Sequence, residues 1–253
     1  MIRGVIFDLG STLIRFEGNW DEVLDQARQA LVEALRQHGV GIDPQAFSAE
    51  FHRQMQAYYH ERETEFIEFS TAYVLRTVLA NFGHPDVPGE VVRRALRQMY
   101  AVSEAHWQPM PDAYTVLDGL QHAGYRLGLI SNAGDEDNVQ RLIDHARLRP
   151  YFDPVIVSAG IGLRKPNPAV FRGVLKAWRL RPREVVMVGD TLGADILGAQ
   201  NAGLHQIWLT AQADSPGNRA HAGTITPEAT AQSLAEVPDL IQQLGHRQLR
   251  RRA

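Results

Sequence analysis

Five short apolar segments recur along the chain, separated by stretches in which apolar residues have a helical spacing. The segments are 4–8, 127–132, 154–158, 185–190 and 206–209. They are rich in β-branched residues and mostly lack alternation, which is typical of strands buried on both faces of a parallel sheet. Between them, residues 112–123 and 168–178 place apolar side chains three and four positions apart, as one helix face does. This order predicts an α/β fold with a doubly wound parallel sheet.

Residues 15–107 have a different pattern, because they contain no strand-like apolar run. An amphipathic stripe extends over 20–35, and further helical patterns cover about 44–62, 66–82 and 88–104. We therefore expect a four-helix insert after the first strand.

The chain is accordingly predicted to divide into an α/β core of residues 1–14 and 108–246 and an all-helical insert of residues 15–107. The polar stretch 211–223, which contains Gly and Pro, is predicted to be a surface loop. Residues 247–253 form a basic tail.

The composition excludes several kinds of chemistry. The chain has 253 residues and no Cys, so a thiol nucleophile, a disulfide framework and a Cys-zinc site are excluded. Lys165 and Lys176 are the only lysines among 26 basic residues. The formal net charge of -3 argues against an electrostatic nucleic-acid binder. No signal peptide or membrane span is visible, so we expect a cytoplasmic protein with neither a nucleic-acid nor a membrane partner.

Polar and acidic residues follow the predicted strands at their carboxyl ends, where open parallel sheets bind ligands. In chain order they are Asp8 with Gly10, Ser11 and Thr12, then Ser131 and Asn132, and finally Asp190 and Asp195. A loop between the last two groups carries Lys165. Three carboxylates in one crevice repel one another, and a hard divalent cation with oxygen ligands would neutralise them. Mg²⁺ is the usual choice beside phosphate. The Lys165 ammonium and the neutral donors would then hold an anionic group.

This ordered set of motifs resembles the haloacid dehalogenase-like (HAD) hydrolase superfamily over nearly the whole chain. Asp8 matches the nucleophile of the family, Thr12 the threonine of the same motif, Ser131 the second motif, Lys165 the third, and Gly189-Asp190 with Asp195 the acidic fourth. The helical insert after the first motif is similar to the C1 cap of the family. The resemblance implies a Rossmann-like core with an inserted cap that closes over the site.

The resemblance also implies Mg²⁺-dependent hydrolysis of a phosphoric monoester on a small metabolite. Asp8 would attack phosphorus and form an aspartyl-phosphate, which water then hydrolyses. Mg²⁺ would be held by Asp8, the backbone carbonyl of Gly10, Asp190 and Asp195. Lys165 would pair with Asp8 and the phosphate, and the other phosphate-binding residues would be Ser11, Thr12, Ser131 and Asn132. The partner is then a small phosphorylated substrate, and we expect a monomer or a homodimer.

Gly10 departs from the D-x-D-x-T pattern of family phosphatases, in which the second Asp is the general acid and base. A glycine keeps the backbone carbonyl but has no proton to transfer, and such transfer typically accelerates a reaction ~10²–10⁴-fold. The phosphatase is therefore expected to be slow unless a cap residue replaces the Asp or the leaving group needs no proton. His38, His52 and His60 are candidates by their chemistry.

Two other functions stay open on the sequence. The 2-haloacid dehalogenases also lack the second Asp, but they carry a bulky aromatic residue there and need no metal. A HAD-fold regulatory module that binds Mg²⁺ and phosphate with little turnover would keep the acidic residues and tolerate Gly10. A phosphonoacetaldehyde hydrolase is excluded, because residues 15–107 contain no Lys for its Schiff base.

Overall fold

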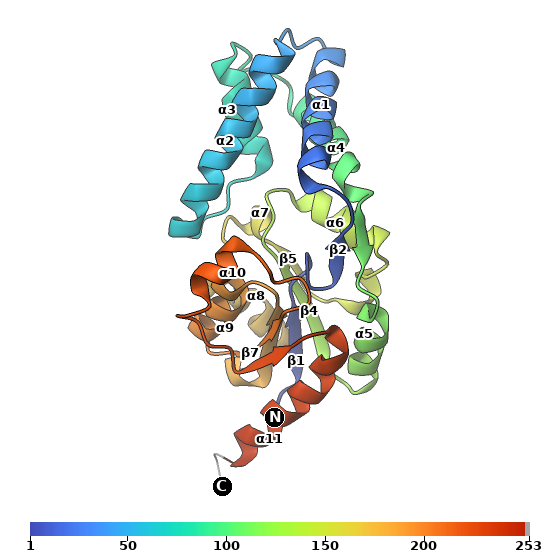
Figure 1. Cartoon of the computed structure of the whole chain (residues 1–253), viewed down its shortest axis with the longest axis vertical. Helices are drawn as coiled ribbons and strands as arrows, with labels where there is room; N and C mark the ends of the chain where they lie inside the picture. Colours follow the sequence, from blue (N-terminus) through green and yellow to red (C-terminus); the bar gives the residue numbers. More distant parts are fainter. Residues whose placement is uncertain (251–253) are drawn as a thin grey trace.

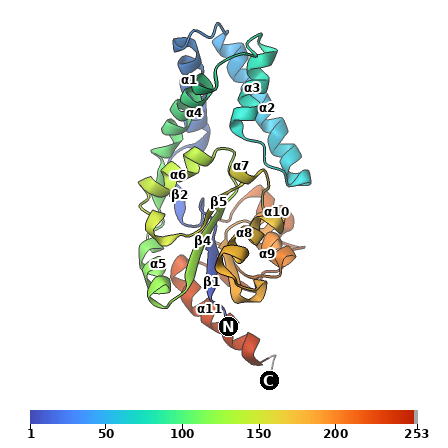
Figure 2. The same cartoon turned by 180° about the vertical axis from the view of Figure 1, so that it is seen from behind.

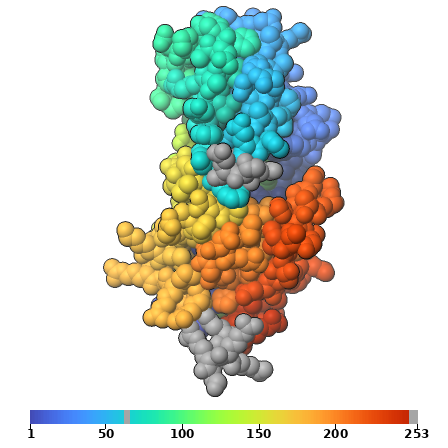
Figure 3. Space-filling model, turned by 90° about the vertical axis from the view of Figure 1, so that its left-hand side faces the viewer, coloured from blue at the N-terminus to red at the C-terminus, as the bar shows by residue number. Residues whose placement is uncertain are grey.

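The structure is a computed structural model that describes the backbone of residues 1–250 and the side chains of residues 1–61 and 66–247. Residues 251–253 of the predicted basic tail, and the side chains of 248–250, lie outside the described residues. Figures 1 and 2 show a helical unit at one end of the molecule and an α/β core at the other. In Figure 3 the helical unit, blue to green, is stacked on the yellow-to-red part of the core.

Six parallel strands form the central sheet in the order β5-β4-β1-β6-β7-β8. The strands are β1 (Gly4–Phe7), β4 (Arg126–Ser131), β5 (Val155–Val157), β6 (Val185–Gly189), β7 (His205–Leu209) and β8 (Ala229–Ala231). Because β1 lies between β4 and β6, the chain winds outward from it in both directions, which confirms the predicted doubly wound, Rossmann-like sheet. The sequence did not predict β8, whose residues Ala-Thr-Ala form no apolar run.

Helices cover both faces of the sheet. On one face lie α5 (Ala113–His122), α6 (Glu136–His145) and α11 (Val237–Arg250), and on the other lie α8 (Ala169–Trp178) and α9 (Leu197–Ala202). The shorter helical turns are η1 (Arg149–Tyr151), α7 (Ser158–Ile161), η2 (Pro182–Glu184), the π-helical turn η3 (Leu192–Ile196), α10 (Pro216–His221) and η4 (Leu234–Glu236). Among the described residues, no helix is both long and apolar enough to cross a membrane.

The central strand β1 is buried on both faces. Val5 and Phe7 pack beneath α5 and α6, whereas Ile6 packs on the opposite face with Trp178, and all three strand residues are 0% exposed. Burying an apolar side chain of this size stabilises a fold by ~1.5–3 kcal/mol. Two glycines make room for the indole, since a Cβ at Gly4 would lie 2.5 Å from the Trp178 ring and one at Gly128 would lie 2.9 Å from it.

Four helices form the cap and enclose a hydrophobic core of their own. They are α1 (Trp20–Gln37), α2 (Pro44–Glu65), α3 (Thr71–Asn81) and α4 (Gly89–Glu104). The chain enters and leaves the cap through an antiparallel ribbon in which β2 (Ile14–Phe16) pairs with β3 (Trp107–Pro109). We expected no strand within residues 15–107; strands of three residues are too short to show a period in the sequence.

The helix predicted over 66–82 begins only at Thr71. Residues 66–70, here named the docking segment, lie outside the helix and contact loops of the core instead. The Glu68 backbone N–H donates to the Gly162 carbonyl at 3.2 Å, and the Thr71 N–H donates to the Gly134 carbonyl at 2.7 Å. Phe66 has a positive φ of 55°, which ends helical geometry there. Contacts with the core therefore override the local helical pattern.

The stretch 211–223 is also more ordered than predicted, because it contains α10. The Ser215 side chain caps this helix by accepting from the Asn218 N–H. Asn218 is buried, and its side chain contacts the loop that follows β6. A polar residue in a Gly- and Pro-containing stretch gives no local sign of such burial.

Candidate active site

The candidate site lies at the carboxyl edge of the three central strands. Asp8 follows β1, Ser131 ends β4, and Asp190 follows β6. Because these strands are neighbours and parallel, their carboxyl ends meet at one edge of the sheet, beneath the cap.

Three carboxylates gather at this edge. One oxygen each of Asp8, Asp190 and Asp195 lies within 4.8 Å of the other two. Asp195 comes from the turn η3, where the Thr191 N–H donates to its Oδ2 at 2.9 Å. A Cβ at Gly189 would lie 2.3 Å from this carboxyl group, so the glycine before Asp190 leaves the space that the cluster needs.

The Lys165 ammonium lies beside the carboxylates and is almost fully buried. Its Nζ is 2.6 Å from Asp8 Oδ1 and 2.7 Å from Asp195 Oδ1, and it also donates to the Ile130 carbonyl at 2.6 Å. The contacts with Asp8 and the Ile130 carbonyl are hydrogen bonds, and the contact with Asp195 is an ion pair. One positive charge therefore faces three carboxyl groups.

Burial and mutual repulsion perturb the protonation of the cluster. Burial raises the pKa of Asp8 to about 6, although the Lys165 charge opposes the rise. Burial also raises the pKa of Asp190 to about 8, and the charges of Asp8 and Asp195 add to that rise. For Lys165, burial acts to lower the pKa, but Asp195 and Asp8 outweigh it and raise the pKa above its ordinary value. An excess of oxygen donors and negative charge suits a hard divalent cation such as Mg²⁺.

The loop after β1 places the rest of the first motif in three different ways. Gly10 faces the indole of Trp107, since a Cβ at this position would lie 3.5 Å from the ring. Ser11 lines the cavity with a left-handed φ of 59°. Thr12 is fully buried and does not line the cavity; its hydroxyl donates to Asp190 Oδ1 at 3.3 Å. In this arrangement Thr12 supports a carboxylate and does not face the space that a phosphate would fill.

Ser131 and Asn132 both line the cavity. The Asn132 amide also fixes the loop that carries the lysine, because its Oδ1 accepts from the Lys165 N–H and its Nδ2 donates to the Lys165 carbonyl, each at 2.9 Å. Asn132 is therefore in a position to orient Lys165 as well as to face a ligand.

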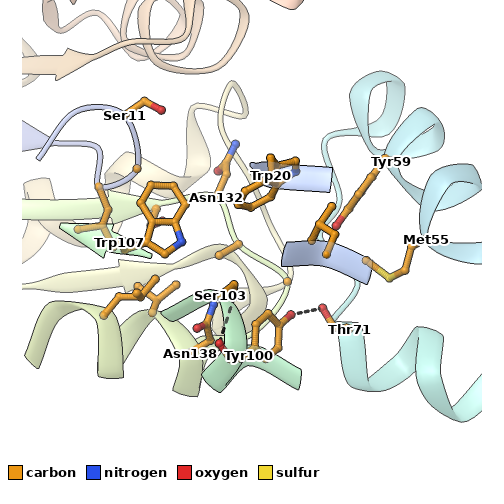
Figure 4. A pocket seen from close by; sticks show the side chains of 18 of the residues that line it. Ser11, Trp20, Met55, Tyr59, Thr71, Tyr100, Ser103, Trp107, Asn132 and Asn138 are labelled. Atoms are coloured by element: carbon orange, nitrogen blue, oxygen red, sulfur yellow. Dashed lines mark hydrogen bonds between the residues drawn. The ribbon is translucent and has the colours of Figure 1, made fainter. Parts of the chain in front are cut away.

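A cavity of about 480 Å³ separates the carboxylate cluster from the cap. Its walls come from α1, α2, α4 and Trp107, as Figure 4 shows for labelled side chains of these elements. Of the three histidines considered as proton donors, only His52 lines the cavity. The His38 ring nitrogen is hydrogen-bonded to the Ala34 carbonyl at the end of α1, and His60 lies on the exposed surface of α2.

Two buried polar residues near the site escaped the sequence analysis. Asn218 Nδ2 donates to the Asp190 carbonyl at 2.8 Å and its Oδ1 accepts from the Leu192 N–H at 2.7 Å, which fixes the backbone around one carboxylate. Glu68 of the docking segment is buried against the core. Both lie in stretches without a motif, so no local signal could have found them.

Comparison with known proteins agrees with this fold. The model of the haloacid dehalogenase-like hydrolase family matches residues 2–203, and the chain belongs to this family. It is therefore an enzyme of the hydrolase class. The chain is 28% identical over 209 residues to the glyceraldehyde 3-phosphate phosphatase of Pyrococcus abyssi, covering 83% of this chain and 82% of that protein.

Two solved structures show the same fold. The 2-haloacid dehalogenase from Pseudomonas syringae pv. Tomato superposes with a TM-score of 0.67 at 22% identity, covering 96% of this chain and 99% of that one. The HAD phosphatase from Thermococcus onnurineus gives a TM-score of 0.62 at 22% identity, covering 95% and 98%. The neighbours thus include both activities that the sequence left open.

Proposed function

We propose that this enzyme is a Mg²⁺-dependent phosphatase that acts on a small phosphorylated molecule with Asp8 as nucleophile. The observation that carries the proposal is the cluster of Asp8, Asp190 and Asp195 with Lys165 at the ends of neighbouring strands. The relative from P. abyssi, whose name specifies a phosphatase, supports the choice of substrate class.

Each residue at the floor of the cavity has a task in this mechanism. A carboxylate oxygen of Asp8 forms a bond to phosphorus while the ester P–O bond breaks, and the leaving oxygen takes a proton from water. Lys165 keeps Asp8 ionised and aligned, and Ser11, Ser131 and Asn132 donate hydrogen bonds to phosphoryl oxygens. Water then hydrolyses the aspartyl-phosphate and restores Asp8.

The metal would be held by Asp8, the Gly10 carbonyl, Asp190 and Asp195. Mg²⁺ supplies positive charge that stabilises the phosphoryl oxygens and lets an anionic nucleophile approach an anionic ester. The donor set fits this ion, because it offers carboxylate and carbonyl oxygens and no sulfur or imidazole ligand.

The assay for this proposal follows phosphate and halide release in parallel. With Mg²⁺, we expect phosphate release from p-nitrophenyl phosphate that EDTA abolishes and added Mg²⁺ restores. Chloride release from 2-chloropropionate without metal would instead assign a dehalogenase. Neither activity, with Mg²⁺ binding retained in a calorimetric titration, would assign a binding module.

A further inference from the structure

The cavity changes character with distance from the carboxylate cluster. Above the polar floor its wall is mainly aromatic and apolar, with a few polar side chains such as His52 and Gln56. The aromatic and apolar residues are Trp20 and Leu24 of α1, Phe51, Met55 and Tyr59 of α2, Met99 and Tyr100 of α4, and Trp107 of β3. Figure 4 shows Trp107 to one side of Asn132, and Trp20, Met55 and Tyr59 to the other. Although they line the cavity, Trp20 is 46% exposed and Tyr59 is 38% exposed, so both leave ring surface open to a ligand.

Formal charge is scarce in this upper part. Among the described residues, Arg28 is the one charged cap residue in the wall, and its guanidinium is paired with Asp25 on the same helix. A second phosphate or a carboxylate on the substrate would therefore find few positive charges in this part of the cavity to balance its negative charge. An aromatic ring would find faces and edges of other rings, which prefer offset or edge-to-face contacts.

We propose that the site takes phosphate monoesters whose body carries a planar aromatic ring of about the size of a nucleobase. This inference rests on the proposed phosphatase function and names the substrate class for the same site. The volume of about 480 Å³ is more than a three-carbon sugar phosphate fills. It falls in the range of ~300–1,000 Å³ that is typical of pockets enclosing larger organic ligands.

A matched pair of esters tests the proposal. Uridine 5′-monophosphate and methyl ribofuranoside 5-phosphate share the phosphoryl group and the leaving alcohol and differ in the ring at C1′. We expect kcat/KM to be ~10-fold or more higher for the nucleotide, as stacking on aromatic side chains provides. Equal values, or a preference for the furanoside, would overturn the aromatic subsite. Loss of phosphate release from every ester, p-nitrophenyl phosphate included, would overturn the phosphatase function itself.

Tyr59→Ala and Tyr73→Ala form a matched pair of variants for the same assay. Tyr59 lines the cavity, whereas Tyr73 is a cap tyrosine that is 57% exposed and lies outside the wall. We expect Tyr59→Ala to lower the nucleotide preference at least threefold and Tyr73→Ala to leave it unchanged. The same preference in both variants would contradict the assignment of Tyr59.

A second inference arises from the contacts between the cap and the core. The Glu68 side chain of the docking segment is 0% exposed and contacts Ser158 and Arg164 of the core. Ser158 Oγ donates to Glu68 Oε2 at 2.8 Å, and Arg164 Nη1 lies 3.4 Å from the same oxygen. Tyr58 of the cap donates its hydroxyl to the other oxygen, Oε1.

These contacts lead to the catalytic lysine by two short routes. Arg164 directly precedes Lys165 in the chain. Ser158 Oγ also accepts from the Ala133 N–H at 2.8 Å, and the neighbouring Asn132 holds the Lys165 backbone through two hydrogen bonds. The loop that contains Lys165 therefore contacts the Glu68 carboxylate through Arg164, and the loop that holds the Lys165 backbone is joined to the same carboxylate through Ser158.

We propose that Glu68 is a positioning residue that couples the docked cap to the placement of Lys165. When the cap is docked, the Glu68 carboxylate fixes the positions of both loops, and Lys165 Nζ keeps its hydrogen bond to Asp8. When the cap is displaced, the loops lose this partner. The lysine is then fully aligned only while the cap covers the substrate.

The chain offers a matched control for this proposal. Glu104 of α4 forms a second cap–core ion pair, 2.8 Å from Arg141 Nε on α6, but contacts neither loop of Lys165. We expect Glu68→Gln to lower kcat by ~10-fold or more with a smaller change in KM, as loss of oriented catalytic groups does. Glu104→Gln should change kcat by less than threefold. Equal effects of the two variants would contradict the proposal, because Glu68 would then only help to hold the cap against the core.

Ser158→Ala keeps the test decisive if Glu68→Gln fails to fold. It removes only the hydroxyl that joins Glu68 to Ala133. We expect a several-fold loss of kcat at an unchanged Mg²⁺ affinity in a protein that is still folded by circular dichroism, although the buried groups left unpaired lower its melting temperature. An unchanged kcat would overturn the coupling.

Discussion

Asp8→Asn is expected to abolish turnover, with kcat for p-nitrophenyl phosphate falling by ~10⁴-fold or more, as loss of a nucleophile does in other enzymes. The amide has the shape of the carboxylate but carries no charge and is a poor nucleophile, so the bond to phosphorus does not form. The fold should persist, because the substitution removes one of three mutually repelling carboxylates and leaves Lys165 its contacts with Asp195 and the Ile130 carbonyl.

Asp214→Asn is the control for this loss. The Asp214 side chain is 90% exposed in the loop before α10, and exposed ion pairs contribute ~0–1 kcal/mol to stability. Its kcat should equal that of the unmodified enzyme. If Asp8→Asn kept a tenth or more of the activity while remaining folded by circular dichroism, Asp8 would not be the nucleophile.

Gly10→Asp is expected to raise kcat for alkyl phosphates by ~10²-fold, the lower end of what general acid–base catalysis supplies. The resemblance to family phosphatases places an acid and base at this position, and the structure accommodates a Cβ there. A Cβ would meet the Trp107 ring at 3.5 Å, an ordinary contact, and Gly10 is not among the residues with positive φ. The new carboxyl group could then protonate the leaving oxygen.

The leaving group provides the readout for this variant. The gain should be large for methyl ribofuranoside 5-phosphate, whose alkoxide needs a proton, and small for p-nitrophenyl phosphate, whose phenolate leaves without one. Gly10→Asn adds a side chain of the same size that donates no acidic proton, and should give no gain. A similar rate in the Asp and Asn variants would show that residue 10 acts through its volume alone.

The position of Gly10 illustrates the limit of sequence reasoning about the site. The missing acid was visible in the sequence, but its surroundings were not, because Trp107 lies nearly a hundred residues further along the chain. The ring approaches Gly10 only because β3 pairs with β2 and closes the ribbon between cap and core. No periodic pattern records a contact of this kind.

The candidate proton donors and the phosphate-facing residues show the same limit. His38, His52 and His60 were equivalent by chemistry, and only the packing of α1 and α2 separates them by placing His52 in the cavity wall. Thr12 belongs to the same motif as Ser11, yet its side chain points away from the cavity and donates a hydrogen bond to Asp190. A change of direction between neighbouring residues depends on the loop conformation, which the sequence does not specify locally.

The sequence by itself determined the sheet and the floor of the site. Strands buried on both faces leave continuous apolar runs, and the carboxyl ends of parallel strands meet at one edge, so Asp8, Ser131 and Asp190 could be grouped in advance. Only the tertiary structure decided how the cap meets that floor. Glu68, Asn218 and the docking segment act through contacts between residues far apart in the chain, and such contacts override local helical or loop preferences.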